Sequence, residues 1–266
     1  MSGHSYRFTH AICRLPGASI VQGLRAVDTG APDLALMRAH HADYVAALRS
    51  TGAAVTVLDP LEDFPDAVFV EDTALCLPQG AVVMRPGAPS RLGEAAEMAP
   101  HLAAFYDEVA RIEGPGTIEG GDILMCETEI LVGRSARTDA AGIADLAGIV
   151  ARWGWTLREV ATPPGVLHFK TDCSLLDEET ILSTRRLSAT GCFDGYRVID
   201  VADGEEAAAN TIRFNDRVLM PAGFPRTRDR LEAAGYAVHE IGNSECAKLD
   251  GGMSCLSLRF SPPVKA

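Results

Sequence analysis

Pairs of short apolar segments joined by turn residues recur along the chain and predict five β-hairpins. They lie at residues 71–85, 121–134, 171–185, 209–220 and 252–260. In the first three hairpins Asp72, Asp122 and Asp172 stand at the same position, at intervals of 50 residues. A fixed period of this size indicates repeated supersecondary units that stack or form a ring.

A helix followed by a strand is predicted between successive hairpins. Apolar residues at helical spacing mark three clear helices, and a glycine in the left-handed conformation ends each of them. These helices are expected at residues 33–50, 138–153 and 226–234, and the strands after them at 53–58, 155–160 and 236–241. A weaker helix is expected at 93–112, kinked or restarted at Pro100, and a short one at 205–209.

These units predict an α/β ring in which five helix–strand–hairpin repeats surround a common centre. Every hairpin needs a pairing partner and every helix needs an apolar surface to cover, and a closed ring with the helices outside satisfies both needs. We expect residues 1–266 to form one such domain, because no linker interrupts the pattern. A doubly wound sheet with hairpin insertions is the alternative architecture.

The composition is ordinary for a soluble globular protein, with 47% hydrophobic and 23% charged residues. A net charge of −12 argues against nucleic-acid binding, which needs basic stripes, and is compatible with a cationic substrate. We find no apolar run long enough to span a membrane and no signal-peptide core. The seven cysteines, an odd number without a Cys-x-x-Cys pair, are therefore expected to be reduced thiols in the cytoplasm.

Polar residues break the apolar pattern at the same place in each unit, the start of the first hairpin strand. The set comprises Asp66, Glu71, Asp72, Glu119, Asp122, His168, Lys170, Asp172, Asp250 and Cys255. Equivalent strand starts in a ring face its centre, so carboxylates, a histidine and a thiol would share one pocket. Carboxylates can hold a planar guanidinium, a cysteine can attack its carbon, and a histidine can move the protons. None of these steps requires a metal or a cofactor.

Each of these residues also has a purely structural explanation. Cys255 could be a small buried hydrophobe, as we expect for the other six cysteines, although two glycines before it permit close approach to a ligand or mark a bulge. His168 lies in an apolar stretch where a core histidine is common. Asp122 and Asp172 could bond backbone amides throughout the repeat. The agreement of several such signals at one position of the repeat favours a site.

At these residues the sequence resembles the dimethylarginine dimethylaminohydrolase family of guanidine-modifying enzymes. The matching motifs run in family order across nearly the whole chain. They are Phe64-Pro-Asp-Ala-Val-Phe-Val-Glu-Asp72, Arg85-Pro-Gly-Ala-Pro-Ser-Arg91, Gly116-Thr-Ile-Glu-Gly-Gly-Asp122, Gly133-Arg-Ser-Ala-Arg-Thr138, Val166-Leu-His-Phe-Lys-Thr171, Met220-Pro-Ala-Gly-Phe-Pro-Arg-Thr-Arg228 and Leu249-Asp-Gly-Gly-Met-Ser-Cys-Leu-Ser-Leu-Arg-Phe260. The whole set is specific, whereas single pieces such as Gly-Gly-x-x-Cys also occur in related deiminases and amidinotransferases.

The resemblance implies a five-bladed α/β propeller, the pentein fold, with the active site at its centre. It implies that Cys255 is the nucleophile, His168 the acid and base, and Glu119 a carboxylate beside the histidine and the guanidinium. The implied substrate-binding residues are Asp72 at the guanidinium nitrogens, Glu71 nearby, Arg91 and Arg137 at the α-carboxylate, Asp66 and the carbonyl of Ile20 at the α-amine, and Leu249. A mobile lid is implied near residues 15–23.

The implied reaction is hydrolysis of asymmetric dimethylarginine or monomethylarginine to citrulline and a methylamine, through a covalent intermediate on Cys255. Two rivals stay open. Arginine deiminases and amidinotransferases use a similar set of residues but are usually longer chains, and a non-catalytic ring that binds a protein partner would need neither Cys255 nor His168. A homodimer is compatible with the sequence.

Overall fold

The computed structural model describes residues 3–263, and the strands within this range form five sheets of three strands each. In every sheet an antiparallel hairpin is extended by a third strand parallel to the middle one. The sheets are β15-β1-β2 (Leu258–Phe260, His10–Arg14, Ala54–Leu58), β3-β4-β5 (Ala74–Cys76, Ala81–Val83, Val109–Arg111), β6-β7-β8 (Ile123–Met125, Ile130–Arg134, Leu157–Ala161), β9-β10-β11 (Cys173–Leu175, Thr180–Ser183, Arg197–Asp200) and β12-β13-β14 (Ile212–Phe214, Arg217–Pro221, Ala237–Ile241).

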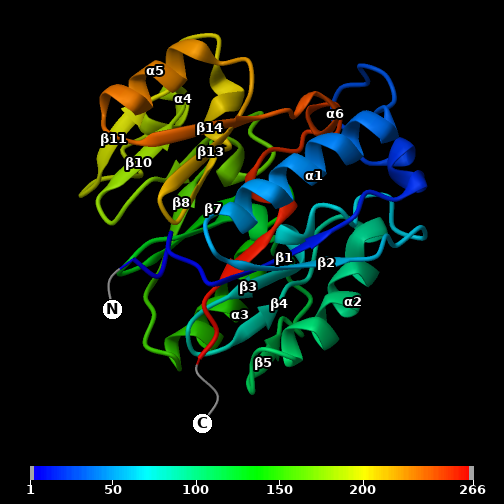
Figure 1. Cartoon of the computed structure of the whole chain (residues 1–266). Coiled ribbons are helices and arrows are strands. Elements are labelled where there is room, and N and C mark those ends of the chain that lie inside the picture. The colour runs from blue at the N-terminus through cyan, green and yellow to red at the C-terminus, as the bar shows by residue number, and fades with distance from the viewer. Residues whose placement is uncertain (1–2, 264–266) are drawn as a thin grey trace.

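A helix connects the middle strand of each sheet to its outer strand, as parallel pairing requires. These helices are α1 (Leu34–Ser50), α2 (Leu92–Ala103), α3 (Ala140–Ala151), α4 (Arg185–Ser188) and α5 (Pro225–Ala233), and a further short helix, α6, spans Ser244–Ala247. Asp33 and Asp139 cap α1 and α3 by accepting the amides of Leu36 and Gly142. The long helices α1, α2 and α5 lie on the outside of the molecule (Figure 1).

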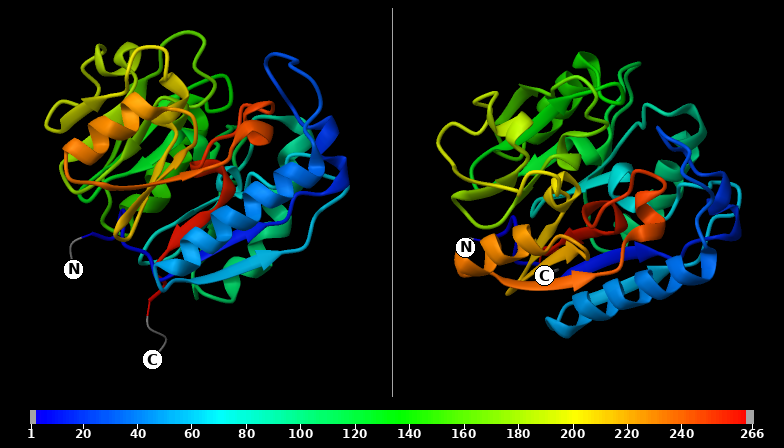
Figure 2. Two further views of the ribbon diagram at one scale, coloured as in Figure 1. Left: turned by 45° about the horizontal axis from the view of Figure 1, so that its top comes forward. Right: turned by 90° about the horizontal axis from the view of Figure 1, so that it is seen from above.

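The ring closes between the two ends of the chain. β15 pairs with β1, so the last strand and the first belong to one sheet, and the red and dark blue strands lie side by side in both figures (Figures 1 and 2). The middle strands are almost wholly buried, because each is covered by its helix and by the neighbouring blades. The predicted five-bladed α/β propeller is thereby confirmed.

Two sequence expectations about elements were wrong. The helix predicted over residues 93–112 ends at Ala103, and β5 follows it, because this unit carries the same third strand as the others. Pro100 lies inside α2 without ending it. The fifth hairpin was expected within residues 252–260, but β15 takes β1 as its partner across the whole length of the chain. The sequence analysis did not predict β1.

A single turn of 3-10 helix precedes the inner strand of each blade, where the sequence predicted strand starts. These turns are η2 (Val70–Thr73), η4 (Gly120–Asp122), η5 (Phe169–Thr171), η6 (Glu206–Ala209) and η7 (Ser254–Leu256). Neighbouring turns contact one another around the centre, and η6 replaces the short helix expected at 205–209. The turns that carry the polar residues of the repeat therefore meet at the centre of the ring. No helix in the described range is long and apolar enough to cross a bilayer.

Candidate active site

A cavity of about 170 Å³ lies at the centre of the ring, on the side of the 3-10 turns. It brings together residues from six separate segments of the chain. Its lining includes Cys255, His168, Asp72, Asp66, Arg91, Arg137, Leu249, Asp250, Phe69, Leu167 and residues 24–26. The thiol and the imidazole, 87 positions apart in the sequence, thus face one cavity.

His168 and Glu119 form a buried pair beside the cavity. The Nε2 atom of His168 lies 2.6 Å from Oε2 of Glu119, whose side chain is fully buried. The other oxygen, Oε1, accepts the backbone amide of Gly87 at 2.9 Å. Burial alone would raise the pKa of Glu119, but the bond to His168 and the nearby arginines lower it to about 2. Glu119 is therefore a carboxylate that binds one ring nitrogen and fixes the orientation of the imidazole.

The same pair keeps the imidazole protonated. Burial lowers the pKa of His168, but the charge of Asp72, the hydrogen bond to Glu119 and the charge of Asp122 outweigh it and raise the pKa to about 9. At neutral pH the side chain is an imidazolium, so it is ready to donate a proton into the cavity.

Asp72 interacts with both the imidazolium of His168 and the guanidinium of Arg91. Its Oδ1 accepts the amide of Gly121 at 2.9 Å, and its Oδ2 lies 2.5 Å from Nη1 of Arg91. A Cβ atom on Gly121 would lie 2.8 Å from Oδ1 and 2.9 Å from Cγ of His168, so only glycine allows this approach. Asp72 therefore has a fixed position from which it can hold a cation.

Asp72, Glu119 and His168 are also the group of described residues whose metal-ligand atoms lie within 4.8 Å of one another. The 2.6 Å contact between His168 and Glu119 is a direct hydrogen bond, with no room for an ion between the two atoms. We interpret the group as a hydrogen-bonded acid–base set.

Cys255 occupies the turn η7 as a half-buried residue that lines the cavity. The backbone amide of Gly252 points at Sγ from 3.5 Å. Burial, followed by the charges of Glu71 and Asp72, raises the pKa of the thiol to about 11. Without a ligand the side chain is thus a protonated thiol, and a cation bound beside these carboxylates would favour the thiolate.

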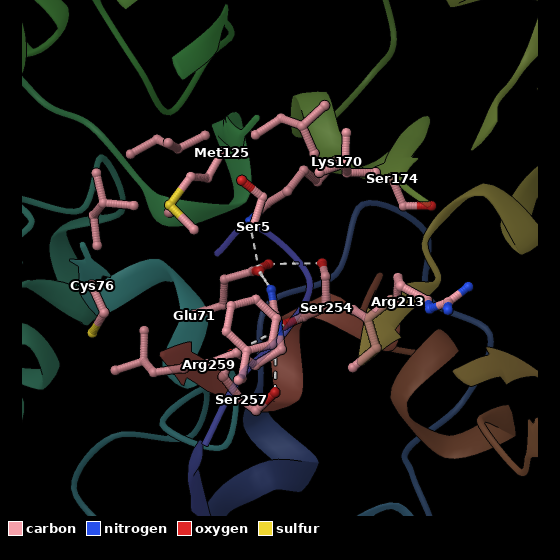
Figure 3. A pocket seen from close by; sticks show the side chains of 18 of the residues that line it. Ser5, Glu71, Cys76, Met125, Lys170, Ser174, Arg213, Ser254, Ser257 and Arg259 are labelled. Carbon is pink, nitrogen blue, oxygen red and sulfur yellow. Dashed lines mark hydrogen bonds and ion pairs between the residues drawn. The ribbon is translucent and has the colours of Figure 1, made fainter. Parts of the chain in front are cut away.

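Glu71 lies behind the nucleophile, not in the cavity. It accepts hydrogen bonds from Lys170, from the hydroxyl of Ser254 and from Arg259, at 2.6 to 2.7 Å. These side chains line a second cavity of about 90 Å³ on the opposite side of the turn (Figure 3). Arg259 also donates to the carbonyls of Ser254 and Ser257, on either side of Cys255. The cluster supports the turn that carries the thiol.

The segment predicted as a lid, residues 15–23, contains η1 (Ala18–Gln22), and it is the next three residues, 24–26, that line the cavity. Two acids hold these three residues in place, because Asp66 accepts the amide of Leu24 at 3.0 Å and Asp250 accepts that of Ala26 at 2.6 Å. Burial raises the pKa of Asp66. Ile20 is fully buried and its carbonyl accepts the amide of Gly23, so it anchors the predicted lid segment in the protein interior.

The two arginines differ in their freedom. Arg91 is buried and donates to Asp72, to both carboxylate oxygens of Glu94 and to the carbonyl of Phe69. Arg137 is about one-fifth exposed, with its nearest carboxylate, Glu119, at 3.5 Å. Arg137 is therefore the arginine with donors available to a ligand.

Several lining residues were not assigned a role from the sequence. Phe69 and Leu167 form apolar walls and Asp250 holds the lid. Asn210, whose amide nitrogen approaches the sulfur of Cys255, was also missed. Its position in the fourth hairpin matches that of Asp72 in the first, a signal that could have identified it. Asp122 takes the structural role, since it accepts the hydroxyls of Ser135 and Thr138.

Comparison with known proteins agrees with this geometry. Residues 34–218 match the family model described as arginine deiminase. The chain is 41% identical over 254 residues to an N(G),N(G)-dimethylarginine dimethylaminohydrolase of Pseudomonas aeruginosa, covering 95% of this chain and 100% of that protein. A protein of the same name from Streptomyces coelicolor is 33% identical, with 94% and 96% covered.

Solved structures show the same relationship. A cysteine-to-serine mutant of the Pseudomonas aeruginosa enzyme, complexed with citrulline, superposes with a TM-score of 0.93 over 96% of this chain and 100% of its own. The N-terminal domain of the cyanobacterial arginine dihydrolase ArgZ shares the fold, with a TM-score of 0.83 at 18% identity. From its similarity to two such relatives over nearly its whole length, the chain belongs to the dimethylarginine dimethylaminohydrolase family.

Proposed function

We propose that this chain hydrolyses asymmetric dimethylarginine and monomethylarginine to citrulline and a methylamine, through a covalent intermediate on Cys255. The observation that carries the proposal is one cavity lined by the thiol of Cys255, the imidazolium of His168 and the carboxylate of Asp72. It combines a nucleophile, a proton donor and a cation holder around one small volume. The family relationship supports the same reaction.

The first half of the reaction forms a carbon–sulfur bond and breaks a carbon–nitrogen bond. A substrate guanidinium beside Asp72 offsets the negative charge that holds the thiol of Cys255 protonated, so the thiol gives its proton to solvent and the thiolate forms as substrate binds. The thiolate attacks the guanidinium carbon. The nitrogen that leaves as dimethylamine takes the proton of His168, and the carbon stays on sulfur as a thiouronium.

The second half reverses the proton transfer. Neutral His168 takes a proton from water, and the resulting hydroxide attacks the thiouronium carbon. The carbon–sulfur bond breaks, the thiolate of Cys255 departs and takes up the remaining proton of the attacking water, and neutral citrulline is released. Glu119 stays ionised throughout and stabilises the imidazolium that forms again.

We propose that the remaining lining residues recognise the amino-acid end of the substrate. Arg137 binds the α-carboxylate together with Arg91, while Asp72 holds the guanidinium from its fixed position. Asp66 exchanges the lid amide of Leu24 for the α-ammonium group, close to Ile20 and Leu249. Glu71 acts through the turn of Cys255 and does not contact the substrate.

The test is the hydrolysis of arginine, monomethylarginine and asymmetric dimethylarginine side by side, with citrulline, ammonia, methylamine and dimethylamine measured separately. We expect citrulline with dimethylamine from the dimethylated substrate and no turnover by a folded Cys255→Ser variant. Ammonia from arginine as the preferred reaction would instead identify a deiminase. A lack of turnover on all three substrates would favour the alternative of a non-catalytic ring that binds a protein partner.

We also propose a cytoplasmic location. All seven cysteines lie in the described part of the chain and are free thiols, which suits a reducing compartment. Fractionation of cells that produce the protein, with a cytoplasmic marker enzyme as reference, tests the location. Recovery in a membrane or exported fraction would contradict it.

A further inference from the structure

Asp72, Asp122 and Asn210, at one position of the repeat, join neighbouring blades, whereas Asp172 at the same position binds Thr184 and Arg186 within its own blade. Asp72 accepts the amide of Gly121 at 2.9 Å, and Asp122 accepts that of Phe169 at 2.8 Å. In the fifth blade (β12-β13-β14), the matching residue is Asn210, which accepts the amide of Ser254 at 3.0 Å. In each case a side-chain oxygen binds the 3-10 turn of another blade. An oxygen is all that this bond requires, so aspartate would serve at position 210 as well.

The second functional group of Asn210 explains why an amide stands there. Because Oδ1 accepts the Ser254 amide, the orientation of the side chain is set and Nδ2 must point the other way. Nδ2 lies 3.8 Å from Sγ of Cys255, within reach of a hydrogen bond to sulfur. An amide nitrogen donates to a thiolate, whereas an aspartate oxygen at the same place would repel it.

The absence of a side chain at Gly252 makes room for the contact between Asn210 and Cys255. A Cβ atom on Gly252 would lie 2.2 Å from Cγ and 2.5 Å from Nδ2 of Asn210, which no side chain can tolerate. The backbone amide of Gly252 itself points at the same sulfur from 3.5 Å. The glycine therefore admits the Asn210 amide to the sulfur and adds a second N–H donor. This arrangement accounts for a glycine immediately ahead of the Met-Ser-Cys segment.

We propose that Asn210, together with the Gly252 amide, forms an anion hole for the thiolate of Cys255 and positions it for attack. The inference rests on the proposed role of Cys255 as nucleophile and adds a positioning residue to that site. It assigns a function to the fifth blade (β12-β13-β14), which contributes no residue to the substrate-binding set.

Other charged groups act on the sulfur from the elements around it. Glu71 and Asp72 on η2 oppose the thiolate, whereas Lys170 on η5 favours it. His168 lines the same cavity, and Arg259 on β15 and Cys246 on α6 interact with the thiol electrostatically. Substitution of Asn210 changes none of these groups, so a changed pH response of the sulfur would report on the amide itself.

The experiment compares Asn210→Asp with Asn210→Ala by the rate at which iodoacetamide alkylates Cys255 between pH 6 and 10, followed by peptide mapping. Asn210→Asp retains the oxygen for the Ser254 amide but places a negative charge at the sulfur. We expect alkylation at pH 8 to be fastest in the wild type, slower in Asn210→Ala, and slowest in Asn210→Asp, by at least about tenfold, the effect of a pKa increase of one unit. Asn243→Asp is the matched control, because its amide binds the Gly251 carbonyl in the same loop.

If Asn210 only holds the turn at Ser254 in place and does not act on the thiolate, a different order of alkylation rates is expected. Asn210→Asp would then alkylate like the wild type and Asn210→Ala would be the damaged variant, a result that would overturn the proposal, as would three equal rates or an equal loss in Asn243→Asp. Circular dichroism verifies that each variant is folded. Alkylation needs no substrate, so the anion hole can be upheld even if methylarginine turnover fails, and refuted even if turnover succeeds.

Discussion

At the scale of single residues, the site works by placing charges whose effects on one another can be followed through their contacts. Glu119 and Asp72 keep His168 protonated, while Glu71 and Asp72 keep Cys255 protonated in the absence of a ligand. The free protein thus holds an acid ready and a nucleophile inactive. A cationic substrate is the group that changes this balance in favour of attack.

Replacement of Glu119 by glutamine should move the pH profile of turnover. The pKa of His168 is about 9, above its ordinary value, so the acid form persists below pH 9 and is lost as the pH rises through that value. Removing the paired charge lowers this pKa, and the alkaline limb of kcat/KM should move down by about 1–3 pH units. Steady-state kinetics from pH 5 to 10 measures it. An unshifted alkaline limb would show that His168 does not supply the proton.

Replacement of Arg137 by alanine should affect binding more than chemistry. A charge-assisted hydrogen bond contributes about 1.5–3 kcal/mol, so KM for asymmetric dimethylarginine should rise about 10- to 100-fold with little change in kcat. The control is a dimethylguanidine substrate without the amino-acid carboxylate, on which the variant and the wild type should perform alike. An equal loss on both substrates would place Arg137 elsewhere in the mechanism.

At the scale of elements, hairpins and long helices are evident from the sequence because their signals are local. The apolar periodicity and the following glycines locate α1, α3 and α5 to within a few residues. β1, β5 and β11 were missed, because strands of three to five residues have weak local signals and β1 finds its antiparallel partner at the opposite end of the chain.

The site shows the same division between local and distant information. The repeat phase was enough to bring Asp72, His168 and Cys255 together. Which way each side chain turns depends on tertiary contacts, and the sequence does not show that Asp72 faces the cavity while its neighbour Glu71 faces away from it. The contact of Asn210 with the sulfur likewise depends on two blades meeting.

The N-terminal cap of α1 offers a test at this scale. Asp33 accepts the amide of Leu36 at 3.0 Å, and Asp33→Ala should lower the free energy of unfolding by about 1 kcal/mol. Asp43→Ala, at an exposed position of the same helix, should change it by less than about 0.5 kcal/mol. Urea unfolding followed by circular dichroism measures both. Equal effects would refute the assignment of the cap.

At the scale of the whole molecule, we propose that residues 1–266 fold as one unit, because the first and last strands share a sheet and neighbouring blades share their inner turns. Phe260 on β15 is buried against His10, Phe105 and Tyr106, so it joins the two ends of the chain to the second blade. A substitution that weakens the packing at this junction should therefore destabilise the whole ring.

Phe260→Ala should lower the free energy of unfolding by about 3–5 kcal/mol, the usual cost of a large cavity. The fluorescence of Trp153 and Trp155, in the third blade where it meets the second, should report the same midpoint as circular dichroism in the wild type and the same shift in the variant. Leu36→Ala, at an exposed site, is the control. Two separate transitions would show that the chain divides into independent parts.

The central claim is that Cys255 carries the reacting carbon, and the most direct measurement is mass spectrometry of the protein quenched in acid during turnover of asymmetric dimethylarginine. Trypsin should release the peptide from Leu249 to Arg259 with the thiouronium attached, and the modification should be absent in Cys255→Ser. Sustained citrulline production by Cys255→Ser, or an adduct found on another residue, would contradict the account.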